Sequence, residues 1–542
     1  MHNTFSLYIF LLLVILFLVM LAHRLKISYP IVLVLGGLCL SFIPRLPQIQ
    51  INPELIFVIF LPPLLFEAAW QTSWKDFWKF RRVIASFAFL IVILTSCVIA
   101  VISSNLIPAF TLPLGFLLGG IISPPDAVSA TSILKSIKVP KRLVTIVEGE
   151  SLLNDASSLI VFRFAYSAID SGKFVFHEAV VSFFVVIIMG ILIGLAVALV
   201  FYAIHRWLPT TTNIDIVLTF IAPYVMYIVA EEFHFSGVLA VVSGGLFLST
   251  RSNVILSPGS RFKGENVWAT IGFALNGIVF MLIGLELPFI VQQMGTVSMG
   301  AAIRYGLIIS LVLIVGRLLC TLGASAFTVF ASKFITTADS RPGWRAPLAL
   351  GWAGMRGVVS LAAALSIPIT LSNGTPFPQR NLILFITFTV ILVTLVFQGL
   401  TLPLVVRWLK LEDNDYPIPY AEQEKAVRRK LAHTGLRVLN EQYQEKIAAN
   451  EQLQSLKVRY ESDIHLLERL QDEAAENMQL AAETTSKHYR AAVGAVIKEQ
   501  RELLQKLNKK EEIDEDLIRK YIGLLDLEEE KIRLMVTGEV TE

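Results

Sequence analysis

The residues EGESLLND at positions 148–155 place three carboxylates, a serine and an asparagine inside a long apolar stretch of the chain. A charge near the centre of a bilayer is costly, so such side chains face a cavity or a partner rather than lipid. On an α-helix, Glu150 and Asn154 share one stripe, while Ser151 and Asp155 share a second stripe about 100° further round. The segment therefore predicts a membrane helix with a polar wedge on one side.

The composition around this segment is that of an integral membrane protein, because 55% of the 542 residues are hydrophobic and the mean hydropathy is +0.65. Charge is unevenly distributed. Residues 1–410 carry 26 Lys and Arg with 15 Asp and Glu, whereas residues 411–542 carry 20 and 28. Apolar residues recur at helical spacing in the second part. We therefore expect an all-α transmembrane domain over 1–410 and a charged, helical cytoplasmic tail over 411–542.

About twenty apolar residues cross a bilayer, and this length predicts thirteen spans. Their approximate ranges are 5–22, 29–43, 53–71, 83–104, 110–134, 142–168, 179–205, 214–232, 236–250, 266–289, 301–331, 344–370 and 381–409. The odd-numbered connections carry seventeen Lys and Arg and the even-numbered ones carry three. This excess predicts an external N-terminus and a cytoplasmic C-terminus. Three histidines near span ends are expected at the membrane interface: His177, His205 and His234.

Two of the predicted spans contain helix breakers next to a charge. Pro124 and Pro125 remove two backbone donors immediately before Asp126, and three glycines surround Arg356 in GWAGMRG at 351–357. The two interrupted spans lie seven apart in the order of spans. This spacing predicts inverted repeats, with a binding site between two broken helices.

The buried acids and arginines have a simpler interpretation as structural ion pairs that neutralise one another. Two arginines, Arg317 and Arg356, fall within predicted spans. Even if both are paired, Asp126 and Asp155 still require a cation. The whole set of charges therefore favours a cation site over a purely structural network.

Six motifs occur along the first 410 residues: LPPLLFEAAW at 61–70, SPPDAVSAT at 123–131, GESLLNDA at 149–156, NGIVFMLIGLELP at 276–288, GWAGMRGVVSLAAAL at 351–365 and FQGLTLPLVV at 397–406. In this order they resemble the Na+/H+ exchanger branch of the monovalent cation:proton antiporters. The resemblance does not extend to the tail. It implies a thirteen-helix antiporter fold, a homodimer, and a mobile core domain that moves against a static dimerisation domain.

The resemblance also implies roles for residues at the motif positions. Asp155 would bind the cation or the proton, with Asn154 beside it and Ser151 adding an oxygen. Asp126 and the backbone of Pro125 would lie at the unwound crossing, so that the transported Na+ is bound at Asp155 and Asp126.

Four further residues complete the implied site. Glu150 would form a structural ion pair with Arg317. Arg356 would lie at the second unwound helix and balance the negative helix ends, and Glu67 would lie near the site. Pro125 departs from the residue that many relatives carry before the aspartate.

The expected function is Na+/H+ antiport by alternating access for pH and cation homeostasis, in the plasma (inner) membrane. Because Asn154 cannot titrate, one exchangeable acid remains and exchange is expected to be electroneutral. The protein is not expected to be an enzyme, to need a cofactor or to bind nucleic acid, and a regulator could bind the tail. The alternatives are a K+ or mixed Na+/K+ exchanger, a cation channel, an intramembrane aspartyl hydrolase, or an added scaffold role for the tail.

Overall fold

The computed structural model describes residues 2–43, 56–135, 137, 139–172, 176–292, 294, 298–331, 343–411, 420–447, 450–472, 493, 495–504, 506, 521–529 and 531. The chain divides into two compact units, Met1–Asp415 and Tyr416–Glu542. Each is described by itself below.

The regular secondary structure in the described part of the first unit is helical apart from one isolated bridge between Thr370 and Pro376. Its helices are α1 (His2–Leu25), α2 (Tyr29–Ser41), η1 (Ile56–Phe60), α4 (Leu61–Gln71), α5 (Trp74–Ala85), η2 (Ser86–Ile91), α6 (Val92–Leu106), α7 (Leu112–Ile122), α8 (Ala127–Lys135), α9 (Lys141–Ser171), α10 (Phe176–Trp207), α11 (Thr212–Glu232), α12 (Gly237–Ile255), α13 (Pro258–Leu285), α14 (Leu287–Gln292), α15 (Met299–Ala331), α16 (Arg345–Trp352), α17 (Val358–Leu365), α18 (Arg380–Val393), η3 (Thr394–Gln398) and α19 (Gly399–Leu409). The elements η1, η2 and η3 are π-helical.

Helix is present in each of the thirteen ranges predicted to span the membrane. Within the described residues, eight helices are long and apolar enough to cross a bilayer. They are Trp74–Leu106, Leu112–Lys135, Ala179–Trp207, Thr212–Glu232, Gly237–Ile255, Pro258–Gln292, Met299–Phe330 and Arg380–Leu409. Three shorter apolar helices occur at Ile9–Leu25, Tyr29–Ser41 and Val58–Gln71. The protein is therefore a multi-pass membrane protein, and the count of thirteen stays a prediction.

Two helices are interrupted at the places where the sequence predicts a break. The chain leaves helical geometry between α7 and α8, at residues 123–126, and between α16 and α17, at residues 353–357. The first break holds the two prolines, which cannot donate a backbone hydrogen bond to the preceding turn. The helix ends created at each break carry unpaired backbone groups that other residues must satisfy.

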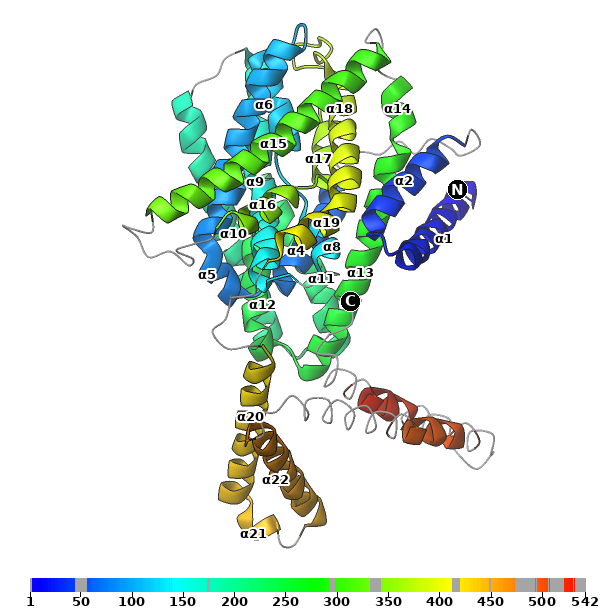
Figure 1. The fold of residues 1–542 in the computed structure, drawn as a ribbon, viewed down its shortest axis with the longest axis vertical. Helices are drawn as coiled ribbons and strands as arrows, with labels where there is room; N and C mark the ends of the chain where they lie inside the picture. Colours follow the sequence, from blue (N-terminus) through cyan, green and yellow to red (C-terminus); the bar gives the residue numbers. More distant parts are fainter. Residues whose placement is uncertain are drawn as a thin grey trace. The chain divides into compact units, whose positions relative to one another are not determined.

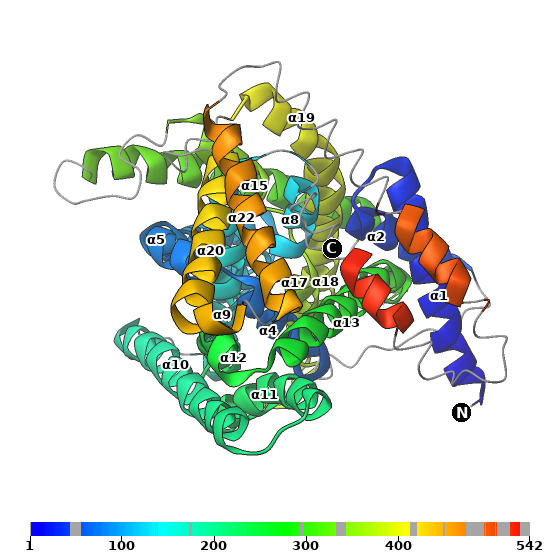
Figure 2. The same cartoon turned by 90° about the horizontal axis from the view of Figure 1, so that it is seen from below.

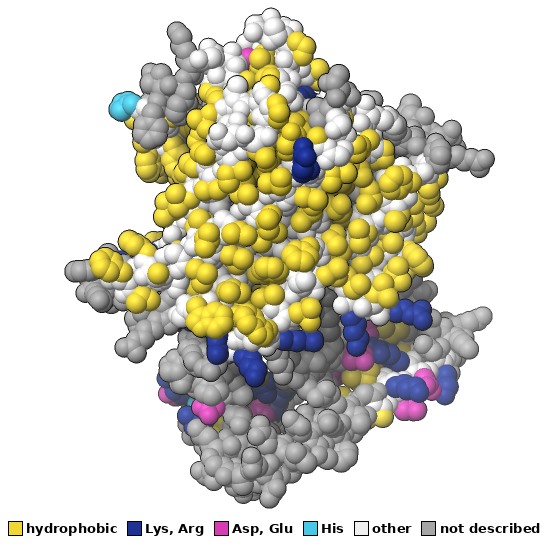
Figure 3. Space-filling view, turned by 45° about the horizontal axis from the view of Figure 1, so that its top comes forward, with side chains coloured by type: hydrophobic (Ala, Val, Ile, Leu, Met, Phe, Trp, Pro, Cys, Tyr) yellow, Lys and Arg dark blue, Asp and Glu magenta, His cyan; other side chains and the backbone are white. Residues whose placement is uncertain are grey.

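Helix α9 contributes buried apolar residues to all three hydrophobic clusters of the first unit. Ala165 belongs to the cluster built mainly from α2, α7, α13 and α18, and Ala156 belongs to the cluster with α10, α11 and α12. Ile146 belongs to the third cluster, with α5, α8 and α16. Figures 1 and 2 both show α9 in the interior, with α1 and α5 on opposite sides of the unit. A broad band of hydrophobic side chains covers the face seen in Figure 3.

The second unit contains a helical hairpin formed by α20 (Tyr420–Gln442), the short α21 (Gln444–Ile447) and α22 (Glu451–Asp472). Ala432, Leu439 and Ile464 are buried between its helices. Gly435 faces Tyr460, and a Cβ atom at this glycine would lie 2.6 Å from the ring atom Cζ. The close approach explains why a glycine occurs in the middle of a helix, where it is otherwise unfavourable.

Candidate functional site

The two interrupted helices meet directly at their breaks. The backbone N–H of Asp126 donates a hydrogen bond to the carbonyl of Met355 at 2.7 Å. Gly357 packs against the side chain of Asp126, and a Cβ atom at residue 357 would lie 2.6 Å from Asp126 Cγ. The glycine-rich break between α16 and α17 therefore allows its backbone to approach the break between α7 and α8.

Asp126 caps the helix that follows it. Its carboxylate accepts hydrogen bonds from the N–H of Val128 at 3.3 Å, the N–H of Ser129 at 3.2 Å and the hydroxyl of Ser129 at 2.7 Å. A carboxylate at this position satisfies N–H groups left free in the first turn and complements the positive end of the helix dipole. The negative charge of Asp126 thus stabilises the N-terminal end of α8 within the membrane domain.

The positive charge of Arg356 offsets the negative helix end on the other side of the first break, where α7 ends. Its side chain is 1% exposed and donates to the carbonyls of Ile122 at 2.7 Å, Ser123 at 3.0 Å and Gly354. These carbonyls lie at or just beyond the C-terminal ends of α7 and α16, where the helix dipole is negative. Within the described residues, the side chain of Arg356 therefore contacts helix-end carbonyls rather than carboxylates. Its backbone N–H donates to the hydroxyl of Thr394 at 3.1 Å.

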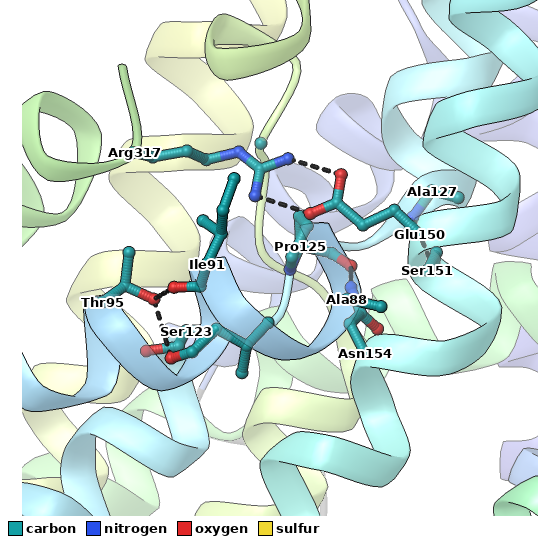
Figure 4. A network of polar contacts seen from close by, with 12 residues as sticks. Ala88, Ile91, Thr95, Ser123, Pro125, Ala127, Glu150, Ser151, Asn154 and Arg317 are labelled. Atoms are coloured by element: carbon teal, nitrogen blue, oxygen red, sulfur yellow. Dashed lines mark hydrogen bonds and ion pairs between the residues drawn. The ribbon is translucent and has the colours of Figure 1, made fainter. Parts of the chain in front are cut away.

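Helix α9 is attached to the first break by two side chains (Figure 4). The amide nitrogen of Asn154 donates to the carbonyl of Pro125 at 2.8 Å, and the N–H of Ala127 donates to the hydroxyl of Ser151 at 3.2 Å. The side-chain oxygen of Asn154 is buried and has no hydrogen-bond partner among the described residues. The polar wedge predicted from the sequence thus faces the unwound segment 123–126.

Asp155 is buried, with 6% of its surface exposed, and forms no hydrogen bond or ion pair with the part of the chain that the structure describes. The carboxylate of Asp126 lies close enough to act on it electrostatically. An ionised, unpaired carboxylate in such a place is costly. A bound proton or a bound cation would remove this cost.

Glu150 lies one turn before Asn154 and forms a two-pronged ion pair with Arg317 of α15. Arg317 Nη1 and Nη2 donate to Glu150 Oε1 and Oε2, each at 2.8 Å, and the two side chains are 2% and 1% exposed (Figure 4). The parallel geometry is the strongest form of an arginine–carboxylate contact. The pair therefore joins α9 to α15 and leaves neither charge available for a transported ion.

Glu67 is half-buried on α4 and lies apart from this network. Its carboxylate accepts a hydrogen bond from Gln71 at 3.3 Å and packs against the backbone of Gly272 in α13. Among the described residues, no hydrogen bond or ion pair joins Glu67 to the other predicted site residues. Lys135, at the end of α8, acts on it electrostatically and lies 3.9 Å from Glu148.

The charges around the crossing do not cancel when all are ionised. Asp126, Glu150 and Asp155 contribute three negative charges, whereas Arg317 and Arg356 contribute two positive charges. One carboxylate therefore lacks a compensating arginine. The contacts assign that deficit to Asp155, because Glu150 forms an ion pair with Arg317 and the carboxylate of Asp126 accepts hydrogen bonds from Val128 and Ser129.

Two site residues were missed because they are uncharged. Thr394 and Gln398 begin and end the π-helix η3, and both are fully buried. Thr394 holds the backbone of Arg356, and Gln398 Nε2 donates to the carbonyl of Trp352 at 3.0 Å. π-Helical turns often mark functional sites, but the sequence contains no signal for this one. The quoted motif FQGLTLP includes Gln398 without indicating its role.

A charged residue was also missed within the sixth predicted span. Arg163 of α9 forms an ion pair with Glu231 at 2.6 Å, and Glu231 also accepts a hydrogen bond from the N–H of Gly237 at 3.1 Å. The pair connects α9 to the junction of α11 and α12. Its charge within a predicted span is the feature of the sequence that could have identified Arg163.

The side chain of His205 is buried within the protein, and its predicted position at the membrane interface stays a prediction. Its side chain is 1% exposed and its Nδ1 atom lies 3.0 Å from Asp215 Oδ1. Asp215 also accepts a hydrogen bond from the hydroxyl of Ser260 at 2.7 Å. The ends of α10 and α13 pack around the start of α11, so a position near a span end became buried. His177 and His234 are exposed.

Comparison with known proteins identifies relatives of this chain. Residues 9–408 match the family model described as "Sodium/hydrogen exchanger, transmembrane". The chain is 33% identical over 427 residues to the "Sodium, potassium, lithium and rubidium/H(+) antiporter" of Bacillus pumilus, and the match covers 77% of this chain and 62% of that relative. It is 33% identical over 418 residues to a Na(+)/H(+) antiporter of Aphanothece halophytica, with 75% of each chain covered.

The fold is similar to a solved structure of the sodium proton antiporter MjNhaP1 from Methanocaldococcus jannaschii. The two chains superpose with a TM-score of 0.61 over 76% of this chain and 99% of that one, at 18% sequence identity. This likeness supports the fold alone. The family match ends at residue 408, so the helical hairpin of the second unit lies outside it.

Proposed function

The chain belongs to the sodium/hydrogen exchanger family of membrane transporters, and from this premise we propose that it exchanges Na+ for protons at Asp155. The observation that carries this proposal is the carboxylate of Asp155, which is buried beside Asp126 without a hydrogen bond or ion pair in the described part of the chain. A proton and a monovalent cation can each neutralise it, but both cannot occupy it together. Exchange follows from this competition.

The oxygens around Asp155 suit a hard monovalent cation, which prefers carboxylate, hydroxyl and carbonyl ligands. Asp126 Oδ1, Ser151 Oγ and the carbonyl oxygen of Pro125 each accept one hydrogen bond and retain a free lone pair. The free side-chain oxygen of Asn154 is a further ligand. We assign the cation to Asp155 and Asp126, with Ser151, Asn154 and Pro125 completing the shell.

Glu67 is assigned a supporting role at the approach to the site, because it lies on α4 near Lys135 rather than at the crossing. Glu150 with Arg317 and Arg356 with the helix-end carbonyls hold the crossing in place. These residues keep the broken helices together while the charge at Asp155 changes.

The proposed architecture extends the observed helices to thirteen spans in two inverted repeats, which place one broken helix in each half. The excess of basic residues in the odd-numbered connections supports an external N-terminus and a cytoplasmic tail in the plasma membrane. A homodimer, in which a core domain moves against a dimerisation domain, completes the proposal.

The direct test is a proton-flux assay with the purified protein in liposomes, in which NaCl, KCl and LiCl are added in turn. NaCl is expected to drive proton release, and choline chloride serves as the salt control. A larger response to KCl would favour a K+ or mixed Na+/K+ exchanger. Single-channel currents in a planar bilayer would instead identify a cation channel, and the absence of any response would overturn the proposal.

Exchange is expected to be insensitive to membrane potential. Asp155 carries either one cation or one proton, and Asn154 cannot titrate, so no net charge moves in a cycle. A potential of 100 mV would act on a moved charge with about 2.3 kcal/mol, so an electrogenic exchanger would respond strongly. The initial rate is measured in liposomes with imposed potentials of both signs. A rate that follows the voltage would show that a second acid titrates, with Asp126 and Glu67 as the candidates.

Deleting the tail from residue 425 is expected to leave exchange active but to shift its maximal rate or its pH dependence. The hairpin of α20 and α22 has its own buried contacts and carries none of the site residues. We assign it a regulatory role, through dimer contacts or a bound regulator. Flux over a range of pH, with full-length protein as the control, measures the effect. Complete loss of exchange in a folded, inserted truncation contradicts this role.

A further inference from the structure

The first three turns of α5 carry a basic and aromatic surface that the transport site does not use. The inward face of this helix is formed by the buried residues Asp76, Phe77, Phe80 and Ile84. The outward face consists of exposed residues: Trp74, Lys75, Trp78, Lys79, Arg81 and Arg82. We call these six residues the α5 outer face.

Three residues of the α5 outer face form one continuous stack. The rings of Trp74 and Trp78 have centroids 5.4 Å apart with an interplanar angle of 28°, and the guanidinium of Arg81 lies 4.5 Å from the ring centroid of Trp78. Arg81 also donates a hydrogen bond to the carbonyl of Trp78 at 2.7 Å. The spacing of four and three residues places all three side chains on one helical stripe.

The residues that follow the α5 outer face along the chain are uncharged. No charged residue occurs between Arg82 and the end of α6, and the side chains that are exposed before Asn105 are apolar. They include Leu90, Leu94, Val98 and Val101, which recur every three or four residues. Tryptophan and arginine next to such a stripe lie at the level of lipid headgroups, with the apolar residues at the level of acyl chains.

The positive charge of the α5 outer face favours a lipid with an anionic headgroup. The only acid of α5 is Asp76, which is 3% exposed and lies 3.2 Å from Lys141, whereas the α5 outer face carries four exposed cations. Basic residues at a membrane surface attract anionic lipids. We propose that the α5 outer face binds an anionic phospholipid, with its phosphate at Arg81 and Lys75, its glycerol region on the tryptophans and its chains along Leu90 and Leu94.

The bound lipid would act on the transport site through one helix. Ile84, on the inward face of α5, packs against Gly149, where a Cβ atom would lie 2.6 Å from Ile84 Cδ1. One turn further, Ser157 of α9 donates to the carbonyl of Ala88. A lipid that fixes α5 therefore fixes the segment of α9 that carries Glu150 and Asp155. This second step rests on the proposed function, whereas lipid binding does not.

The test compares Arg81→Gln and Trp78→Ala with the wild-type protein. The matched control is Arg304→Gln, because Arg304 is also exposed and lies 5.8 Å from the ring centroid of Tyr305, at the start of α15. Retention of phosphatidylglycerol and phosphatidylcholine is measured by native mass spectrometry and by lipid-induced shifts in melting temperature. A juxtamembrane basic residue contributes about 1 kcal/mol, so Arg81→Gln should weaken phosphatidylglycerol retention about fivefold. Phosphatidylcholine retention should not change.

Equal retention of phosphatidylglycerol by wild type and Arg81→Gln would overturn the proposal, as would an equal loss in Arg304→Gln. A wild-type protein that holds both lipids equally would also overturn it. Exchange is measured separately in liposomes of each lipid, where phosphatidylglycerol should accelerate wild type more than Arg81→Gln. A wild type that binds phosphatidylglycerol selectively but exchanges no Na+ would reject the proposed function and leave the lipid site intact.

Discussion

Asp155→Asn is expected to reduce Na+-driven proton flux to the level of protein-free liposomes. Asparagine has nearly the same shape but cannot exchange a proton, and it removes the one carboxylate at the crossing that lacks a partner in the described chain. The fold should survive, because Asp155 forms no hydrogen bond or ion pair there that the substitution would break. Flux in liposomes, together with melting temperature and size-exclusion chromatography, measures both parts of this expectation.

The matched control for this variant is Asp170→Asn on the same helix. Asp170 lies near the end of α9, where its carboxylate accepts hydrogen bonds from the N–H and the hydroxyl of Ser372 at 2.9 and 2.8 Å. It is the same substitution at a position outside the crossing, so exchange should be retained. Full activity in Asp155→Asn would place the exchanging acid elsewhere, with Asp126 as the next candidate.

The breaks in the two helices could be predicted from the sequence because they depend on local chemistry. Two consecutive prolines end a helix wherever they occur, and the glycines around Arg356 allow a close approach of backbones. The unequal charge of the two parts of the chain can likewise be found by counting the charged residues in the sequence. These signals predicted the positions of both breaks before any contact was known.

The partners of the charged residues depend on the three-dimensional crossing. Asp126 is three residues from Ser129, so its capping role was visible in principle, but the same aspartate also suited a cation ligand. Arg356 reaches carbonyls more than 230 residues away in the chain, at Ile122 and Ser123. No spacing rule connects such positions. The sequence alone therefore indicated a charge balance without showing that one arginine contacts helix ends and the other contacts Glu150.

The burial of His205 shows a further limit of hydropathy. Its position near a span end suggested an interfacial residue. A hydropathy pattern locates a residue along one helix, but it does not show which neighbouring helices cover the end of that helix. Asp215 and Ser260 come from two other helices and enclose the imidazole. Only the packing of α10, α11 and α13 determines this environment.

Removing one partner of the Glu150–Arg317 pair is expected to destabilise the protein strongly. Both side chains are almost completely buried, so Glu150→Gln leaves the Arg317 guanidinium without its counter-charge, and Arg317→Met leaves the carboxylate stranded. Breaking a buried ion pair in this way typically costs about 3–5 kcal/mol. Thermal melting in detergent should therefore show a large decrease for each single variant.

The double variant Glu150→Leu with Arg317→Met separates the effect of the buried charges on stability from the effect of side-chain packing. Replacing both charges by apolar groups removes the desolvation cost, so the double variant should melt well above either single variant. Arg163→Gln and Glu231→Gln provide the matched control on the same helix. That pair is 44% and 30% exposed, and exposed pairs contribute about 0–1 kcal/mol. If Glu150→Gln and Arg317→Met lower the melting temperature no more than these controls do, the buried pair does not hold α9 to α15. The stability of the crossing would then rest on the carbonyl contacts of Arg356.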